Sequence, residues 1–146
     1  MHFASNGSPS PTRTTSARED PRRILGRLGE QLAAAHLERL GFAVIDRNAR
    51  TRYGEIDLVA FDGQTLAFIE VKTRRARKRW QLSAEEQPLA WLKTRQRTRI
   101  RRLAVAWLHS ESRNRPTAHT IRFDAIGVVV DDAGRLLSLD HLENAW

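Results

Sequence analysis

The sequence contains no cysteine. Disulfide bonds, thiolate nucleophiles and cysteine-based zinc sites are therefore excluded. No apolar stretch reaches the roughly 18–20 residues that a membrane-spanning helix needs, and none resembles the apolar region of a secretory signal. The 5 histidines show no metal-ligand spacing, so we expect them to be surface or packed residues. We predict a cytoplasmic protein with no membrane partner.

Acidic residues are scarce relative to basic ones. Lys and Arg number 25 and Asp and Glu 17 among 146 residues, which gives a formal net charge of +8, and the isoelectric point is near 11.2. An isoelectric point above about 9 is typical of nucleic-acid-binding proteins, because Lys and Arg displace the counterions condensed on phosphates. No basic amphipathic helix with a bulky exposed apolar face is evident. The composition therefore favours nucleic acid over anionic lipid as the partner.

Residues 54–75 hold the clearest structural pattern in the chain. Two runs rich in β-branched and aromatic residues, 55–61 and 64–72, flank the dipeptide Asp62-Gly63. Asp-Gly between two such runs is typical of a hairpin with a two-residue turn. The sequence therefore predicts two antiparallel strands that are joined at these two residues.

This turn sets a register for the predicted hairpin. Asp57 then lies opposite Phe68 and Glu55 opposite Glu70, and because side chains alternate along a strand, these acids and Lys72 project from one side. Asp57 and Glu70 become diagonal neighbours, with Cα atoms roughly 7–8 Å apart. We expect the other side to be the core face. It carries Ile56, Leu58, Ala67, Ile69 and Val71.

The acids on one side of this hairpin are typical of a metal site. Neighbouring carboxylates repel one another unless a pKa rises or a cation binds. Their oxygen atoms suit Mg²⁺ or Mn²⁺, and Lys72, two residues after Glu70, can hold a water or a phosphate oxygen beside the ion. A hairpin with an ordinary solvated polar side accounts for the same residues. The pattern alone supports the two interpretations about equally.

Four short motifs occur along the chain. They are Gly29-Glu30, Arg52-Tyr53-Gly54-Glu55-Ile56-Asp57-Leu58, Phe68-Ile69-Glu70-Val71-Lys72-Thr73-Arg74 and Arg122-Phe123-Asp124. Together they resemble the signature of the YraN family, small bacterial proteins with a restriction-endonuclease-like core of the PD-(D/E)xK type. The order of a helix Glu, a strand Asp and a Glu-x-Lys is also similar to that of the archaeal Holliday junction resolvases. The resemblance covers about Leu25 to Trp146.

This resemblance implies a metal-dependent nuclease. Carried over by position, Glu30, Asp57 and Glu70 bind Mg²⁺ or Mn²⁺, and together with the catalytic Lys72 they form the catalytic set. It also implies DNA rather than RNA as the substrate, including branched DNA, and a homodimer by analogy with the resolvases. The chain departs from the family pattern after Lys72, where a Phe-Gly-Xaa-Pro type segment is usual and this chain reads Arg79-Trp80-Gln81-Leu82-Ser83.

Glu30 has two interpretations of its own. It lies at the rim of the apolar stripe of a helix predicted at Ile24 to Leu40, which Gly41 ends. A carboxylate there is costly unless it is paired or metal-bound. From the residues alone the simpler explanation is a first-turn Glu favoured by the helix dipole, with its head in solvent. Only the family resemblance favours a ligand.

The remaining pattern predicts one α/β domain, residues 24–146, after a disordered Ser-, Thr-, Pro- and Arg-rich tail, residues 1–23. This domain is expected to contain a central mixed β-sheet flanked by helices, in a restriction-endonuclease-like arrangement. Asp124 is expected to be a structural acid paired with a nearby Arg. Besides the first helix and the hairpin, we expect a strand at 42–46, a basic connection at 47–53, a helix at 88–108, strands at 119–130 and 136–139, and a C-terminal segment, 140–146, that caps the core.

Several basic residues near the candidate site are predicted to contact phosphates. They are Arg50, Arg52, Arg74, Arg75 and Lys93. For the first two, a solvated loop with scattered arginines is almost as good an explanation. The run 73–79, with 5 basic residues in 7, either clamps a nucleic-acid backbone or is an ordinary solvated segment. Trp80 after it either stacks on an unpaired base or anchors the core.

Two functions follow from these observations. The first is a Mg²⁺- or Mn²⁺-dependent endonuclease that acts on DNA. The second is a non-catalytic nucleic-acid-binding module in repair, recombination or RNA-linked assembly, since a fold does not settle an activity. The presence of all four candidate catalytic residues favours the enzyme.

Overall fold

A computed structural model describes residues 17–146 except 91, 93 and 111–114. Its elements confirm the predicted α/β class, with a central mixed sheet and helices packed against it. In chain order they are α1 (Pro21–Arg39), β1 (Ala43–Thr51), β2 (Gly54–Phe61), β3 (Thr65–Arg75), the short 3₁₀ helix η1 (Arg79–Gln81), α2 (Thr94–Leu108), β4 (Thr120–Val130) and β5 (Leu136–Leu142).

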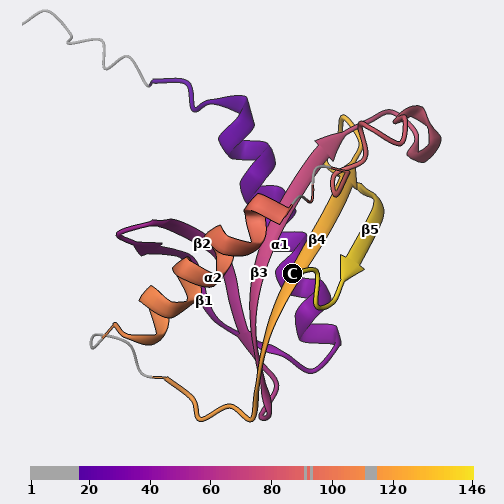
Figure 1. Ribbon diagram of the computed structural model, residues 1–146. Helices are drawn as coiled ribbons and strands as arrows, with labels where there is room; N and C mark the ends of the chain where they lie inside the picture. Colours follow the sequence, from indigo (N-terminus) through magenta and orange to yellow (C-terminus); the bar gives the residue numbers. More distant parts are fainter. Residues whose placement is uncertain (1–16, 91, 93, 111–114) are drawn as a thin grey trace, which may run out of the picture.

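The five strands form one sheet in the order β1-β2-β3-β4-β5. β3 and β4 run parallel, and the other neighbouring pairs are antiparallel. A parallel pair needs a long crossover connection, and the segment between β3 and β4, which includes α2, provides it (Figure 1).

The two helices cover opposite faces of the sheet. On one face Leu37 of α1 belongs to a buried cluster with Ile69 of β3. On the other face Ile100 of α2 belongs to a second cluster with Phe68. The prediction of a single core face on the hairpin was therefore wrong, because the side that carries Glu70 is also covered. Ile56, which was assigned to the same side as Ile69, lies instead in the α2 cluster.

Helix α1 begins at Pro21, three residues before the predicted start. The Asp20 carboxylate accepts a hydrogen bond from the Arg22 N–H at 3.0 Å, and Pro21 suits the first helical turn. The last residues of the predicted disordered tail thus belong to the helix, whereas its first sixteen residues lie outside the described part. Gly41, with φ of +93°, follows the helix end as expected.

Strand β1 is longer than predicted. It continues through the expected basic connection to Thr51, because residues from Ala43 to Thr51 pair with β2, ending at Thr51 opposite Gly54. A register shift interrupts the pairing between Val44 and Asp46. Arg47 and Arg50 are therefore strand residues rather than loop residues.

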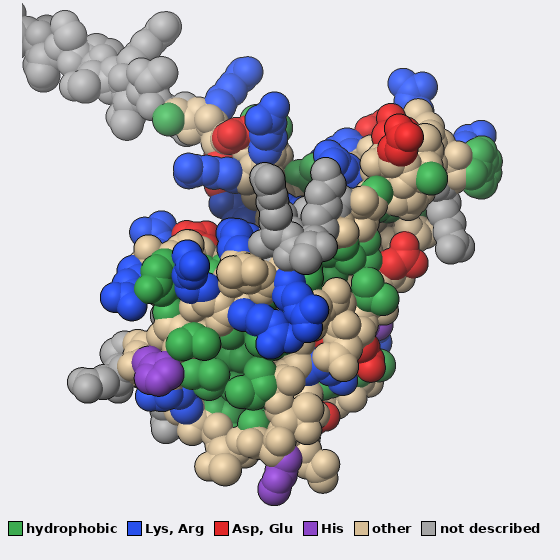
Figure 2. All heavy atoms as spheres, in the orientation of Figure 1, with side chains coloured by type: hydrophobic (Ala, Val, Ile, Leu, Met, Phe, Trp, Pro, Cys, Tyr) green, Lys and Arg blue, Asp and Glu red, His purple; other side chains and the backbone are tan. Residues whose placement is uncertain are grey.

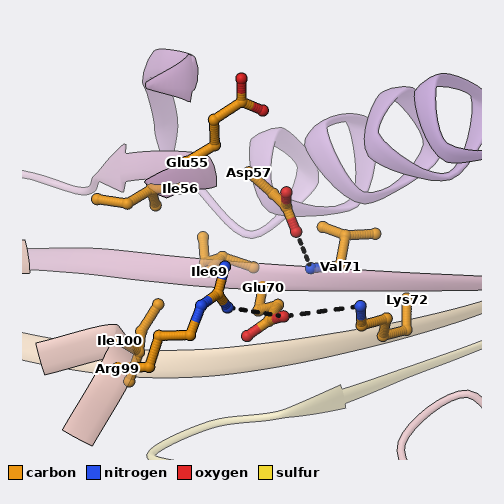
Figure 3. A pocket seen from close by; sticks show the side chains of 9 residues that line it. All are labelled: Glu55, Ile56, Asp57, Ile69, Glu70, Val71, Lys72, Arg99 and Ile100. Atoms are coloured by element: carbon orange, nitrogen blue, oxygen red, sulfur yellow. Dashed lines mark hydrogen bonds and ion pairs between the residues drawn. The ribbon is translucent and has the colours of Figure 1, made fainter. Parts of the chain in front are cut away.

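The β2–β3 hairpin has a different register from the predicted one. Phe61 lies opposite Leu66 instead of Gln64, and Leu58 lies opposite Ile69. Three residues, 62–64, separate the strands instead of two, and Asp62 Oδ1 accepts the N–H groups of Gln64 and Thr65, at 2.9 and 2.7 Å. Over the paired residues this shift of two keeps each side chain on its predicted side. Beyond that pairing Ile56 lies in the α2 cluster, and Asp57 lies on the opposite side of the β3 ribbon from Glu70 (Figure 3), so the prediction that both acids project from one side was wrong.

The segment between β3 and α2 was predicted incorrectly. Residues up to Arg75 belong to β3, and the second helix begins at Thr94 rather than at Pro88. The segment 76–90 projects beyond the end of the sheet (Figure 1). The chain then comes back to the sheet, where Pro88 and Leu89 lie close to Gly127. Trp80, which is 78% exposed, is not a core anchor.

The C-terminal part confirms the structural role predicted for Asp124. This fully buried carboxylate accepts bonds from the Arg122 guanidinium and the Asn144 N–H, and lies 2.8 Å from His141 Nε2. β5 extends to Leu142, beyond the predicted end. Trp146 packs against the α2 cluster, as expected for a capping segment.

Among the described helices, none is long and apolar enough to cross a membrane.

Candidate functional site

The candidate site lies where β2 separates from β3. The pairing of β2 with β3 ends at Leu58 opposite Ile69, while β2 continues to pair with β1 as far as Gly54. The Asp57 carboxylate oxygen Oδ2 takes the place of a main-chain partner and accepts the Val71 N–H at 2.8 Å. An acidic side chain thus occupies the opening between two strands.

A pocket of about 220 Å³ occupies this opening. β2 contributes Glu55 and Asp57, β3 contributes Glu70 and Lys72, and α2 contributes Arg99 to its lining. In Figure 3 Asp57 lies on one side of the β3 ribbon and Glu70 on the other, with Lys72 and Arg99 on either side of the Glu70 carboxylate. The structure therefore brings three of the four predicted catalytic residues to one pocket.

Glu70 is the most buried acid of this pocket, with 8% of its surface exposed. Its Oε1 atom lies 3.6 Å from Arg99 Nη1 and 3.8 Å from Lys72 Nζ. Its Oε2 atom is buried and accepts no hydrogen bond from the residues that the structure describes. A buried carboxylate oxygen without a partner is costly, so Glu70 is suited to an additional ligand.

Asp57 is costly to ionise in this position. Its pKa is raised to about 6, chiefly by burial; the charges of Glu30 and Glu70 contribute to the rise, and the bond from Val71 and the charge of Lys72 oppose it. A raised pKa that arises from burial and neighbouring acids is typical of functional sites. A cation at this position would remove the cost of ionising Asp57.

Glu30 lies beside the pocket rather than in its lining. The carboxylate oxygen Oε2 accepts a hydrogen bond from Asn48 Nδ2 at 3.0 Å, and Glu30 lines a neighbouring hollow that also includes Glu55. Burial is the largest cause that raises the pKa of Glu30, and the charge of Glu55 adds to it. Glu30 therefore acts on Asp57 through its charge, at a distance that leaves it outside the pocket.

The predicted phosphate contacts are dispersed. Arg50 Nε donates to Glu55 at 3.1 Å, beside the pocket. Arg52 lies at the β1–β2 turn and Arg74 is exposed at the end of β3. Arg75 Nη1 donates to the main-chain oxygens of Asp131 and Asp132, each at 3.0 Å. Lys93 lies outside the described residues.

Two pocket features were missed by sequence reasoning. Arg99 was counted only as part of a basic helix, although its position next to Ile100, on the apolar stripe of α2, places it at the edge of the buried face. Asn48, with φ of +47°, carried no recognisable signal as a partner of Glu30. Its role depends on β1 passing beside α1, which local pattern does not specify.

Asp57 and Glu70 fit a Mg²⁺ or Mn²⁺ ion. The orphaned Oε2 atom of Glu70 and the raised pKa of Asp57 are both relieved by a cation in the pocket. Mg²⁺ usually keeps several waters and takes only one or two carboxylates plus substrate oxygens. Within the described residues no three His, Asp or Glu side chains are grouped closely enough to hold one ion, so two protein ligands are the set that this geometry offers.

Comparison with known proteins gives a consistent result. The sequence model of the uncharacterised protein family UPF0102 matches residues 29–128, a span that contains all four predicted catalytic residues. A UPF0102 protein of Pelotomaculum thermopropionicum is 39% identical over 127 residues, which cover 87% of this chain and 98% of that protein. Another from Acidothermus cellulolyticus is 44% identical over 123 residues, or 80% and 86% of the two chains. A third, from Streptomyces griseus, is 45% identical over 113 residues, or 77% and 88%.

Proposed function

We propose that this chain hydrolyses phosphodiester bonds in DNA with the help of Mg²⁺ or Mn²⁺. The chain belongs to the UPF0102 family, which is the YraN family that its motifs resemble. The observation that carries the proposal is the buried Oε2 atom of Glu70, which lacks a partner among the described residues and lines the same pocket as Asp57. Lys72 and Arg99 add positive charge to this pocket, which suits a phosphate substrate, and Glu55 is a third acid in its lining.

In this proposal Asp57 and Glu70 hold the cation. Mg²⁺ or Mn²⁺ there would activate a water for attack on phosphorus and offset the negative charge that builds up on the phosphate. The bond from the Val71 N–H keeps the Asp57 carboxylate at the pocket. Glu30 adds negative charge beside the ligands and acts through an intervening water, since it does not line the pocket.

Lys72 and Arg99 have complementary roles in this mechanism. Their cationic groups lie within 4 Å of Glu70 Oε1. With a cation bound at Glu70, Lys72 and Arg99 would be placed to contact non-bridging phosphate oxygens, and Lys72 would also orient the attacking water. The leaving oxygen receives a proton from solvent, because the pocket is open to the surface on the side of Lys72, whose side chain is 45% exposed.

One observation favours the non-catalytic alternative. Arg99 and Lys72 already balance the charge of Glu70 within the protein, so a stable fold does not require a metal ion. A nucleic-acid-binding module that keeps the pocket as a structural ion-pair network remains the second candidate. The two candidates differ in whether the pocket binds a divalent ion and whether DNA is cut.

The deciding experiment compares wild type with Glu70→Gln, which keeps the shape of the side chain and removes its charge. A labelled panel of duplex, single strand, flap, four-way junction and RNA is incubated with Mg²⁺, Mn²⁺ or EDTA. We expect metal-dependent cutting of DNA by the wild type. The variant should lose more than the roughly 10–100-fold that loss of an outer-shell metal partner costs. Calorimetric titration with Mn²⁺ gives a second readout that does not depend on activity.

Glu38→Gln is the matched control. Glu38 is exposed on α1, and the only partner described for it is Arg47 at 3.9 Å, so this variant should cut DNA and bind Mn²⁺ like the wild type. If neither the wild type nor Glu70→Gln cuts any substrate while both bind DNA equally well, the nuclease proposal fails and the binding module takes its place.

A further inference from the structure

We propose that the hollow beside Tyr53 binds an unpaired nucleotide of a DNA strand, whose base stacks on the Tyr53 ring and whose phosphate contacts the arginines around it. This inference rests on the proposed nuclease function, because it names that enzyme's substrate as DNA with a single-stranded segment next to the cut. The binding step itself is independent of catalysis and can be measured without it.

Tyr53 is held at a fixed place on the surface. In the turn between β1 and β2, Thr51 Oγ1 accepts the Tyr53 N–H at 3.1 Å and donates to the Gly54 carbonyl at 2.9 Å. Gly54, with φ of +132°, adopts a conformation that side-chain-bearing residues rarely reach. Tyr53 nevertheless remains 43% exposed. A large aromatic side chain is thus ordered and left accessible.

Two arginines from different elements contact the Tyr53 ring. The guanidinium carbon of Arg52, its neighbour in the turn, lies 4.7 Å from the ring centroid, and that of Arg102, on α2, lies 5.4 Å from it. Both side chains are exposed. Aromatic rings and guanidinium planes are the two surfaces on which proteins stack unpaired bases. The arrangement therefore presents stacking surfaces that are already in position.

The hollow beside the ring has the mixed character of a nucleotide site. Its volume is about 360 Å³, within the range of small-ligand pockets. Val105 and Ala106 give it an apolar part next to Tyr53, and Arg52, Arg101 and Arg102 surround that part with positive charge. A second hollow, of about 390 Å³, shares Arg52 and Ala106 and adds Arg50. On this face Lys and Arg side chains gather over α2 and the β1–β2 turn (Figure 2).

The positive charge of the lining indicates which class of ligand suits the Tyr53 hollow. The described lining of these two hollows contains four arginines and no Asp or Glu. By contrast, the hollow beside Glu30 sets arginines against Glu30 and Glu55. An occupant of the Tyr53 hollow therefore needs an anionic group beside a flat apolar group, which is the chemistry of a nucleotide. A base inside a duplex has both faces covered by the neighbouring base pairs, so a base that stacks on Tyr53 must come from a single-stranded segment.

The Tyr53 hollow lies near the candidate active site. Neighbouring residues of α2 line the two, since Arg99 and Ile100 line the pocket and Arg101 lines the hollow. Tyr53 precedes Asp57 by four residues, which at the rise of a strand is at most about 13 Å. Successive nucleotides of a stacked strand are about 3.4 Å apart. The unpaired nucleotide should therefore lie within about four nucleotides of the phosphate that is cut.

The test uses the full chain in EDTA, with a DNA duplex that carries a single-stranded overhang. 2-Aminopurine, whose fluorescence falls on stacking, is placed at each overhang position in turn. We expect quenching at one position near the duplex junction. Tyr53→Ala should abolish this quenching and weaken overhang binding by roughly fivefold to a hundredfold, the usual loss for one stacked base, whereas Tyr53→Phe should preserve both. Thermal melting confirms that each variant is folded.

Two further variants locate the effect. Trp80→Ala removes the exposed aromatic residue of the projecting segment and should leave the quenching unchanged, and Glu38→Gln, which changes an exposed acid of α1, should do the same. If Tyr53→Ala binds and quenches like the wild type, or if Trp80→Ala abolishes the signal instead, the assignment to Tyr53 is overturned. Binding of polyglutamate in preference to the oligonucleotide would also overturn it. Quenching that depends on Tyr53, in a protein that cuts nothing, would contradict the nuclease proposal alone.

Discussion

A single carboxylate, Asp57, links the stability of the protein to the chemistry of the pocket. Burial and the acids Glu30 and Glu70 raise its pKa to about 6, whereas an Asp in an unfolded chain has a pKa of about 3.9. Because the folded-state pKa is the higher one, the proton on Asp57 stabilises the folded state. This stabilisation is complete below about pH 4 and is lost as the pH rises through about 6.

Asp57→Asn should therefore stabilise the metal-free protein at neutral pH. The amide oxygen can still accept the Val71 N–H, which now bonds to the carboxylate at 2.8 Å, but the variant has no charge to desolvate. We expect its free energy of unfolding in EDTA to exceed that of the wild type by about 1–3 kcal/mol at pH 7, and the gap to close near pH 4. Urea unfolding curves at a series of pH values measure this gap.

A divalent ion provides the control for this prediction. Mg²⁺ should stabilise the wild type more than Asp57→Asn, because only the wild type gains a charged ligand when the ion binds. A stability gap that stays constant from pH 4 to pH 7 would instead mean that Asn acts through packing and that the ionisation of Asp57 costs little.

At the scale of the elements, the β2–β3 hairpin shows how far local pattern reaches. Alternation predicted Asp57, Glu70 and Lys72 on one side, and all three do line one pocket. An error of two residues in register leaves the paired side chains on their own sides, but Asp57 lies beyond that pairing and on the opposite side of β3 from Glu70. The loop length was wrong because the Asp62 carboxylate accepts two N–H groups and stabilises a longer turn. The opening at Asp57 depends on pairing between β1 and β2, which no property of the hairpin specifies.

The second helix was predicted to start too early for a similar reason. Leu89 and Leu92 continue the apolar spacing of α2 back toward Pro88, so a period of 3.6 residues alone includes them. In the structure, Pro88 and Leu89 instead lie close to Gly127 of β4, which leaves room for them because glycine has no side chain. This tertiary contact thus determines the conformation of Pro88 and Leu89, although their apolar spacing continues that of α2.

Helix α1 offers a test of the packing that places Glu30. A Cβ on Gly29 would clash with Thr73 Oγ1 and lie 2.8 Å from Thr73 Cβ. Gly29→Ala should therefore push α1 away from β3 and lower the free energy of unfolding by about 1–3 kcal/mol, although Ala is the better helix former by about 1 kcal/mol. Urea unfolding measures the change, and Thr73→Ala in the same chain should recover part of it.

Gly26 is the matched control on the same helix. No described atom lies within 4 Å of a Cβ built on Gly26, so Gly26→Ala should leave stability unchanged or raise it by up to about 1 kcal/mol. If both variants lose stability equally, the glycines matter for the helix itself and the contact between Gly29 and Thr73 is not what fixes α1 on the sheet.

At the scale of the whole molecule, composition favours one class of partner but does not specify the arrangement of the core. The net charge of +8 favours a polyanion without saying which basic residues meet it. The covering of both sheet faces was missed because Glu70 and Lys72 marked the second side of the hairpin as polar, although Leu66 and Phe68 on that side are as apolar as the residues on the first. Both faces are buried because the chain crosses the second face of the sheet as α2.

Arg74 and Arg75 allow the charge argument to be tested on the intact protein. Although they are neighbours at the end of β3, Arg75 donates to the Asp131 and Asp132 carbonyls, while Arg74 is exposed. Each phosphate contact contributes about −0.9 to the slope of log binding constant against log salt concentration. Arg74→Gln should therefore reduce the magnitude of this slope by about one, measured by anisotropy with a labelled duplex.

Arg75→Gln should leave the slope unchanged and instead lower the free energy of unfolding by about 1–3 kcal/mol, because two carbonyl oxygens of the β4–β5 turn lose their donor. The pair of variants thus separates a cation that meets DNA from one that holds a turn, at adjacent positions and with the same change of charge. An equal reduction of slope in both would assign phosphate contacts to Arg75 as well, as its sequence position predicted. An unchanged slope in both would place the phosphate contacts elsewhere on the basic surface and exclude this end of the sheet.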